Sequence, residues 1–141
     1  MTKSEVAKVS VRLKVPFHDL DPMGIVWHGN YLKYFEIARD ALFERRGFDI
    51  YKYCVANDYV LPIIRITVKH VHPLRLADEF TCEAVLVEAR NKLVVDYEIR
   101  LCEKDKLVAK ARTEQAAVTV KDEKLELRIP EEIVKEIGME E

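Results

Sequence analysis

The chain of 141 residues is short enough for one domain with a single hydrophobic core, and we expect that domain to span residues 1–141. Because 49% of the residues are hydrophobic and 34% are charged, the composition excludes an intrinsically disordered chain and favours a soluble globular protein. The net charge of −2 argues against nucleic acid as the main partner, no apolar run could span a membrane, and the N-terminus lacks the apolar core of a signal peptide. We therefore expect a cytoplasmic protein.

The first regular pattern is an alternation of apolar and polar residues at 8–17. It places Val9, Val11, Leu13, Val15 and Phe17 on one side of the chain. A period of two residues predicts a β-strand with one buried face.

The next segment, 17–31, carries an aspartate through a Pro/Gly turn into the start of a helix. Asp21-Pro22-Met23-Gly24 has the composition of an ordinary β-turn, and this tetrapeptide by itself favours that interpretation. A carboxylate beside a helix N-terminus also combines an acid or base with backbone N–H donors and the positive end of the helix dipole. A reaction in which a nucleophile attacks a polarised carbonyl requires these groups.

Apolar residues three to four positions apart predict a long helix over 31–46. We expect Asn30 to cap its N-terminus and Gly47 to take the left-handed conformation just beyond its C-terminus. Arg45 and Arg46 favour the last turn, where cations complement the helix dipole. Residues 48–58 show no clear period, so a short helix and an irregular connection both remain open.

The second half of the chain returns to a period of two and predicts four consecutive β-strands. They are expected at 60–70, 79–88, 93–101 and 107–120, with tight loops at 89–92 and 103–106. Pro130 is expected at the start of a short terminal helix. One apolar helix followed by antiparallel strands predicts an α+β fold in which the sheet curls around the helix.

Neither the cysteines nor the histidines indicate a metal or redox site. Cys54, Cys82 and Cys102 are far apart and form no Cys-x-x-Cys pair, so we expect ordinary thiols. His70 and His72 share one face of a strand, but a metal site needs three or four ligands and no third is evident. We expect no metal and no cofactor.

The segment around the turn resembles the active-site segment of the hotdog-fold acyl-CoA thioesterases. The similarity lies in Asp-Pro-x-Gly-Ile-Val-Trp at 21–27 and His-x-Asn-Tyr at 28–31, and it points to the 4-hydroxybenzoyl-CoA thioesterase and YbgC-like group. The resemblance implies a hotdog fold, in which an antiparallel sheet wraps one long central helix. It also implies hydrolysis of an acyl-CoA thioester, with coenzyme A as part of the substrate.

The same resemblance implies roles for two residues of the segment. Asp21 would attack the thioester carbonyl or activate a water molecule to do so, and both routes remain open. The backbone N–H near His28 would polarise the carbonyl oxygen, and the His28 imidazole is a further candidate. The alternative for His28 is a polar residue near a helix start with no role in chemistry.

Other positions match different members of the family, so aryl and short aliphatic acyl groups both remain open. Trp27 matches the hydroxybenzoyl-type enzyme, whereas Glu36 matches the YbgC-like pattern and Phe17 replaces a tyrosine of that pattern. Both Trp27 and Glu36 are expected to contact the substrate. The structural alternatives are plain packing for Trp27 and an ion pair with Arg39 for Glu36.

The loop at 88–92 resembles the basic loop that binds coenzyme A phosphates in the hydroxybenzoyl-type enzyme. Arg90 and Lys92 match its basic positions, and charge-assisted hydrogen bonds to phosphate oxygens supply the mechanism. A basic hairpin tip is also an ordinary surface feature, which is the alternative.

The resemblance finally implies an active site between two subunits, in a homodimer at minimum and more often a tetramer. An outer sheet face and sheet edges need cover, and Val94, Cys102, Val108 and Val118 add apolar residues opposite the main alternation. Two other functions stay open: hydrolysis of acyl-carrier-protein thioesters, and acyl-CoA binding by a hotdog domain without hydrolysis.

Overall fold

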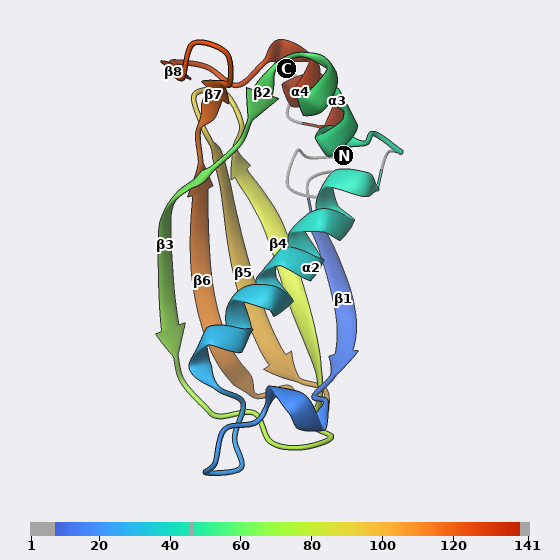
Figure 1. Cartoon of the computed structure of the whole chain (residues 1–141). Helices are drawn as coiled ribbons and strands as arrows, with labels where there is room; N and C mark the ends of the chain where they lie inside the picture. The colour runs from blue at the N-terminus through green and yellow to red at the C-terminus, as the bar shows by residue number, and fades with distance from the viewer. Residues whose placement is uncertain (1–7, 46, 139–141) are drawn as a thin grey trace.

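A five-stranded antiparallel sheet and one long helix form the main part of the structure, a computed structural model that describes residues 8–45 and 47–138. The sheet strands, in spatial order, are β1 (Lys8–Lys14), β4 (Glu79–Glu88), β5 (Leu93–Leu101), β6 (Leu107–Gln115) and β3 (Ile63–His70). Helix α2 (Tyr31–Glu44) runs across one face of this sheet (Figure 1). The α+β architecture predicted from the sequence is confirmed.

Helix α2 packs on the sheet through the apolar stripe that its sequence predicts. The buried members of the stripe are Tyr31, Tyr34, Phe35, Ala38, Leu42 and Phe43. The centroids of the Phe35 and Tyr97 rings lie 5.0 Å apart, as do those of Tyr34 and Phe80. Burial of these rings stabilises one orientation of α2 and so fixes where its N-terminus points.

None of the helices in the described part of the chain is both long and apolar enough to cross a membrane.

The two ends of α2 differ in part from the prediction. Gly47 has a φ of +77°, as expected for the residue that follows a helix C-terminus. Asn30 is not a side-chain cap, because a 3₁₀ turn (η2, His28–Asn30) precedes α2. The Asn30 side chain instead donates a hydrogen bond of 2.8 Å to the Asp19 carbonyl oxygen. Arg46, which the sequence predicts in the last turn, lies outside the described residues.

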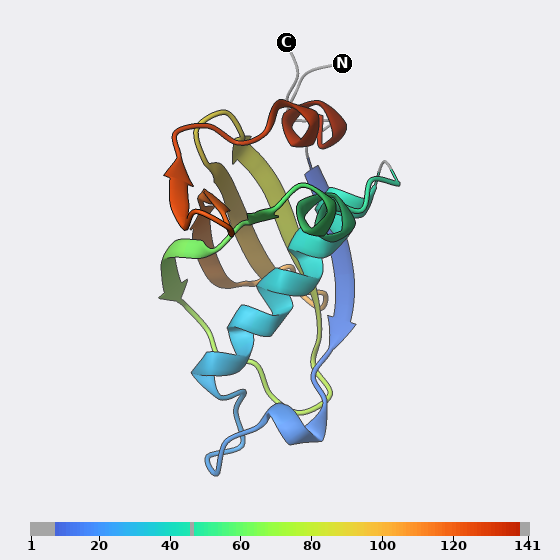
Figure 2. The same cartoon turned by 45° about the horizontal axis from the view of Figure 1, so that its top comes forward.

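Short elements gather at the end of the molecule where α2 finishes. They are α3 (Ile50–Ala56), β2 (Tyr59–Val60), β7 (Ala117–Thr119), β8 (Lys124–Glu126) and α4 (Glu131–Glu136). The strands β2, β7 and β8 form a separate small sheet, which the sequence did not predict. The strand predicted at 107–120 is therefore divided, because the chain leaves β3 after β6 and then pairs with β2. Segment 17–30 lies at the opposite end (Figures 1 and 2).

Three further predictions concern the limits of elements. The strand predicted at 8–17 stops at Lys14, since Pro16 lacks an N–H and Phe17–Asp19 form a 3₁₀ turn (η1). The alternatives left open for 48–58 resolve into the helix α3, which Asp49 caps by accepting a hydrogen bond of 2.9 Å from the Lys52 N–H. The terminal helix expected after Pro130 is confirmed as α4.

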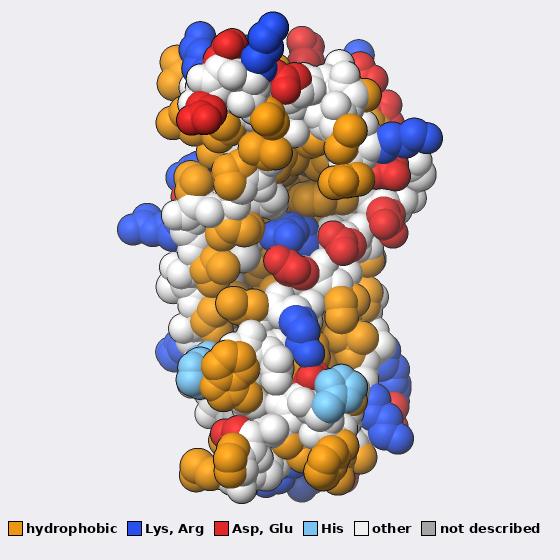
Figure 3. Space-filling model, in the orientation of Figure 1, with side chains coloured by type: hydrophobic (Ala, Val, Ile, Leu, Met, Phe, Trp, Pro, Cys, Tyr) orange, Lys and Arg blue, Asp and Glu red, His pale blue; other side chains and the backbone are white. Residues whose placement is uncertain are grey.

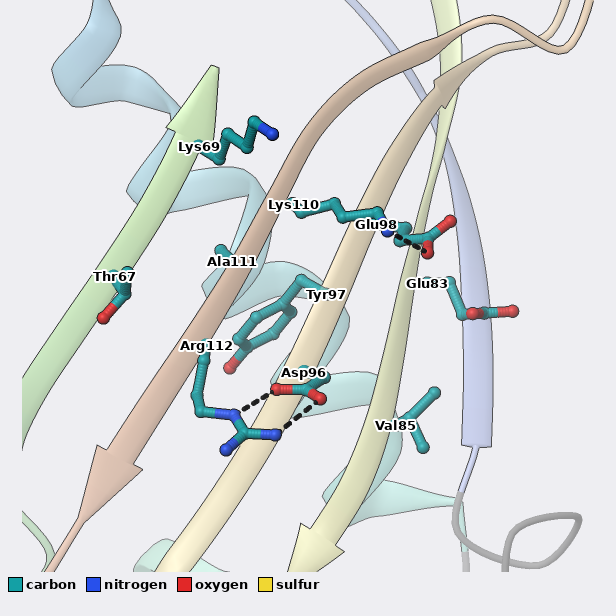
Figure 4. Close-up of a pocket in the computed structure, with 10 residues that line it drawn as sticks. All are labelled: Thr67, Lys69, Glu83, Val85, Asp96, Tyr97, Glu98, Lys110, Ala111 and Arg112. Carbon is teal, nitrogen blue, oxygen red and sulfur yellow. Dashed lines mark hydrogen bonds and ion pairs between the residues drawn. The ribbon is translucent and has the colours of Figure 1, made fainter. Parts of the chain in front are cut away.

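The sheet face away from α2 is charged. A shallow cavity of about 470 Å³ on this face is bordered by cross-strand ion pairs, Arg112 with Asp96 and Lys110 with Glu98 (Figure 4). Val94 and Val108 do not add to an apolar outer surface, because other parts of the chain bury them to 4% and 0% exposure. The prediction that Val94 and Val108 add exposed apolar surface to this sheet face is therefore wrong.

Candidate active site

Residues 19–27 form a tight β-hairpin that carries Asp21. At its base the Trp27 N–H donates to the Asp19 carbonyl oxygen at 3.0 Å, and nearer the tip the Asp21 N–H donates to the Ile25 carbonyl oxygen at 2.8 Å. The Gly24 N–H closes the turn with a bond of 3.0 Å to the Asp21 carbonyl oxygen. Gly24 has a φ of +82°, which explains glycine at this position. The predicted turn is confirmed.

The Asp21 carboxylate has one oxygen held by the turn and one that is available. Oδ1 accepts hydrogen bonds from the N–H groups of Met23 at 2.8 Å and Ile25 at 3.4 Å. Oδ2 has no hydrogen-bond or ion-pair partner among residues 8–45 and 47–138, and the residue is only partly buried. Held in this way, the side chain has a fixed direction and keeps the lone pairs of Oδ2 for chemistry.

The hairpin leads directly into the N-terminus of α2 through the turn η2. The first N–H groups of a helix have no acceptor inside the helix. Those of His28 and Gly29 bind no carbonyl or side-chain oxygen in the described chain. They also lie at the positive end of the helix dipole, where an oxygen that gains negative charge is stabilised. One short segment therefore supplies both a carboxylate and backbone donors.

A buried aspartate that the sequence did not single out attaches the hairpin to α2. Asp19 is 3% exposed, and its carboxylate accepts hydrogen bonds from the Tyr34 hydroxyl at 2.6 Å and the Lys33 ammonium at 2.7 Å. Burial by itself would raise the pKa of Asp19, but the bonds from Lys33 and Tyr34 outweigh it and lower that pKa. Burial and the contact with Asp19 raise the pKa of Tyr34. These residues are 14 and 15 positions apart, so no local period marks the contact.

The family follows from the comparison with known proteins. Residues 15–137 match the model of the thioesterase-like superfamily. The chain belongs to this superfamily. A protein of Aquifex aeolicus (strain VF5) that is assigned as an esterase is 30% identical to it over 125 residues, which cover 87% of this chain and 92% of that protein. The resemblance proposed from segment 21–31 is confirmed, and the chain is a thioesterase-type enzyme.

Solved structures of thioesterases share its fold. The 1,4-dihydroxy-2-naphthoyl-CoA thioesterase from Synechocystis superposes with a TM-score of 0.84 at 19% identity, covering 92% of this chain and 95% of that one. The 4-hydroxybenzoyl CoA thioesterase from Pseudomonas sp. strain CBS-3 gives a TM-score of 0.79 at 23% identity, covering 92% and 99%. At these identities the likeness concerns the fold, and it confirms the hotdog architecture.

In this thioesterase-like chain the Trp27 side chain packs on the turn η2, which precedes α2. Its indole lies 5.1 Å from the His28 imidazole, measured between ring centroids. A Cβ built on Gly29 would lie 2.2 Å from the indole, so glycine is required for the ring to rest there. Trp27 is nevertheless 51% exposed. The residue thus contacts η2 and is also half exposed, so its position agrees with both interpretations considered from the sequence.

We expect Gly29→Ala to displace the Trp27 ring, because a methyl group and the ring cannot occupy the same space. The tryptophan emission should shift, and kcat/KM for a thioester substrate should fall about tenfold if the ring contacts the substrate. Thiol release and fluorescence measure the two effects. In a Trp27→Ala background the same change should have no further effect, and a further loss there would show that Gly29 acts by another route.

Glu36 lies on the exposed face of α2. Its side chain is 61% exposed, and its Oε2 lies 3.5 Å from Nη2 of Arg39. This contact is the ion pair of the structural alternative. A substrate contact for Glu36 stays a prediction.

Arg90 and Lys92 belong to the loop between β4 and β5, which lies at the end of the molecule opposite to segment 17–30, the segment that carries Asp21 (Figures 1 and 2). They follow β4, whose 10 residues at about 3.3 Å each extend over roughly 33 Å. The Asp21 hairpin is bonded to the segment that precedes β4, where the Val26 N–H donates to the Leu74 carbonyl oxygen at 2.9 Å. A single chain therefore does not bring the two predicted parts of the site together.

A broad cavity of about 850 Å³ lies beside Arg90, between the β4–β5 loop and the C-terminal segment. The cavity has mixed charge, because Glu88, Glu126 and Glu131 line it together with Arg128 and Lys135. The sequence analysis missed Arg128 and Lys135. They are distant from Arg90 along the chain, so no local motif could have joined them to it. Lys92 instead pairs with Glu114 at 2.5 Å.

His70 has a packing contact and Cys82 is buried. The His70 ring packs edge-on against Tyr31, with centroids 4.8 Å apart. Burial raises the pKa of the Cys82 thiol to about 12, which keeps it protonated at neutral pH. Within the described ranges no three His, Cys, Asp or Glu side chains are grouped so that they could hold a metal ion.

Proposed function

We propose that this protein hydrolyses acyl-CoA thioesters to the free acid and coenzyme A. The observation that carries the proposal is the Asp21 hairpin, in which a fixed carboxylate with an available Oδ2 belongs to the same short segment as the N–H groups of His28 and Gly29 that precede α2. Thioester hydrolysis needs both a base or nucleophile and donors for the carbonyl oxygen. Binding of an acyl-CoA without hydrolysis requires neither.

Both routes considered for Asp21 use this arrangement. In the first, Oδ2 attacks the thioester carbonyl carbon, the C–S bond breaks, coenzyme A leaves as the thiolate, and water hydrolyses the resulting anhydride. In the second, Oδ2 accepts a proton from the water that attacks this carbon, and the proton passes to the sulfur as the C–S bond breaks. In each route the N–H groups of His28 and Gly29 donate to the carbonyl oxygen as it gains charge.

For the acyl group we propose an aryl or a short aliphatic chain. The two structural relatives described above are named for aryl thioesters of coenzyme A, which supports the aryl class. The open side of Trp27 offers an aromatic surface on which an aryl group could stack. A coenzyme A thioester as substrate also agrees with the cytoplasmic location expected from the sequence.

Release of free thiol from a panel of thioesters tests the proposal. We expect turnover of benzoyl-, acetyl- or butyryl-CoA, and slower turnover of palmitoyl-CoA. Faster turnover of the same acyl group on a carrier protein would favour the carrier-protein thioesterase. Binding of these thioesters without any thiol release would favour the non-hydrolytic acyl-CoA-binding function.

Arg90→Ala should raise the KM for an acyl-CoA about tenfold and leave kcat near its original value. A phosphate contact far from the thioester binds the ground state and the transition state equally. The matched control is the same acyl group on pantetheine, which lacks the nucleotide phosphates and should be hydrolysed equally well by both proteins. Equal losses on the two substrates would contradict the phosphate contact.

Lys92 is a less direct test of coenzyme A binding, because it already has a partner. Its hydrogen bond holds the pKa of Glu114 below the ordinary value, and the Glu114 side chain is only 11% exposed. Lys92→Ala would leave that carboxylate without its cation and lower stability. A change in the KM of Lys92→Ala can therefore be assigned to coenzyme A binding only if thermal melting shows that the variant keeps its stability.

We further propose that two copies pair through β3, which with β1 is one of the two edge strands of the main sheet. Ile64 and Ile66 on β3 are 56% and 41% exposed, and Ile37 on α2 is 44% exposed. Figure 3 shows hydrophobic side chains along this side of the molecule. An apolar edge strand with unpaired backbone groups is a ready site for pairing with another chain.

Pairing of β3 with its own copy brings opposite ends of the two chains together. If the twofold axis is perpendicular to the sheet, the two strands run antiparallel, so the Asp21 end of one subunit lies near the end of the other that carries Arg90. One acyl-CoA could then contact both. The tetramer expected from the resemblance needs a second interface, and if it uses the charged outer sheet face it should weaken at high salt.

A further inference from the structure

The base of the hairpin is attached to α2 through Asp19. Its Oδ1 accepts a hydrogen bond from Lys33 Nζ at 2.7 Å, and its Oδ2 accepts one from the Tyr34 hydroxyl at 2.6 Å. Its carbonyl oxygen accepts from the Trp27 N–H at 3.0 Å and from Asn30 Nδ2 at 2.8 Å. Asp19 therefore binds the second strand of the hairpin, the turn η2 and the first turn of α2.

The two strands of the hairpin are held differently. The second strand is bonded at Val26 to the Leu74 carbonyl oxygen, at 2.9 Å. The first strand carries Asp21, and within the described residues every hydrogen bond that joins it to η2 or α2 has Asp19 as acceptor. Met23 at the tip is 82% exposed and gives little support. The direction of the first strand thus depends on its pairing with the second strand and, for its attachment to α2, on Asp19.

The charge of Asp19 matters as well as its shape. A buried carboxylate is costly unless a cation and hydrogen-bond donors compensate it. Lys33 supplies the cation from a side chain that is 52% exposed, and His18 Nε2 lies 3.7 Å from Oδ1. Asparagine has the same size, but its amide group would face one of the two donors that now point at the carboxylate. At least one attachment would be lost.

We infer that Asp19 is a positioning residue, which fixes the base of the hairpin on α2 and so sets where Asp21 stands relative to the N–H groups of His28 and Gly29. The inference rests on the thioesterase function proposed above. It makes the rate of the chemical step depend on a buried side chain that itself does not touch the substrate.

Asp19→Asn should lower kcat ten- to a hundredfold and leave KM within about twofold, because a displacement near 1 Å can cost about a hundredfold in rate. The matched control is Asp96→Asn, which removes a carboxylate paired with Arg112 on the outer sheet face. That variant should keep its kcat. Lys33→Met should also lower kcat, and Lys33→Arg, which keeps the cation, should restore most of it.

A second readout does not depend on activity. Trp27, the only tryptophan of the chain, sits at the base of the hairpin, so its quenching by acrylamide reports the attachment. Quenching should increase in Asp19→Asn and stay unchanged in Asp96→Asn. If the original protein hydrolyses no thioester, the proposed function fails, and quenching still decides whether Asp19 holds the hairpin.

A folded Asp19→Asn protein with the original kcat overturns the inference, whatever its quenching. Equal losses of kcat in Asp19→Asn and Asp96→Asn indicate a general loss of stability and overturn it too. If Asp19→Asn does not fold, Tyr34→Phe decides by the same two measurements. It keeps the carboxylate and removes one donor, so a lower kcat with greater quenching supports the inference, and unchanged values contradict it.

Discussion

Asp21→Asn should lower kcat at least about a hundredfold and leave the fold intact. Asparagine keeps an Oδ1 that can accept the hydrogen bonds from the Met23 and Ile25 N–H groups, so the turn retains its bonds. The substitution replaces Oδ2 by the NH2 group of an amide. This group can neither attack a carbonyl nor accept a proton. Thiol release under saturating substrate measures kcat, and thermal melting measures stability.

Asp21→Ala separates the chemical role of this side chain from its role in the turn. It should lose the same activity and in addition about 1 kcal/mol of stability, because the Met23 N–H loses its acceptor. Asp96→Asn should retain full activity. If folded Asp21→Asn protein hydrolyses the best substrate of the panel at the original rate, the carboxylate takes no part in the reaction.

Mixing the inactive Asp21→Asn protein with Arg90→Ala protein should restore activity at substrate concentrations far below KM. If each site takes Asp21 from one subunit and Arg90 from the other, a mixed dimer has one site with both substitutions and one with neither. Random exchange of subunits in equal amounts then gives about a quarter of the original activity. Thiol release after slow exchange, compared with the two proteins assayed separately, measures this gain.

A site made within one chain predicts no gain, because each site of a mixed dimer would carry one of the two substitutions. The mixture would then show only the average of the separate activities. Light scattering at the assay concentration must show a dimer for the experiment to apply. An active monomer that keeps its mass through dilution would contradict the shared site directly.

The sequence by itself determined the parts of this protein that depend on local geometry. Alternation with a period of two located the strands at 79–88 and 93–101, and a period near 3.6 located the helix that starts at Tyr31, since side chains repeat at these intervals along each backbone conformation. The turn at Asp21 and the helix start behind it are also local. Their residues by themselves carry the resemblance to the thioesterases.

Tertiary structure alone decided how distant residues meet. It joined Asp19 to Lys33 and Tyr34, and it placed the β4–β5 loop, which carries Arg90, at the opposite end of the molecule from segment 17–30, which carries Asp21. It also divided the strand predicted at 107–120 between two sheets. The apolar period of a strand is the same whether the strand stays beside one neighbouring strand or moves to another. The sequence also does not distinguish a buried aspartate from an exposed one. Contacts between separate elements depend on packing, which no local period encodes.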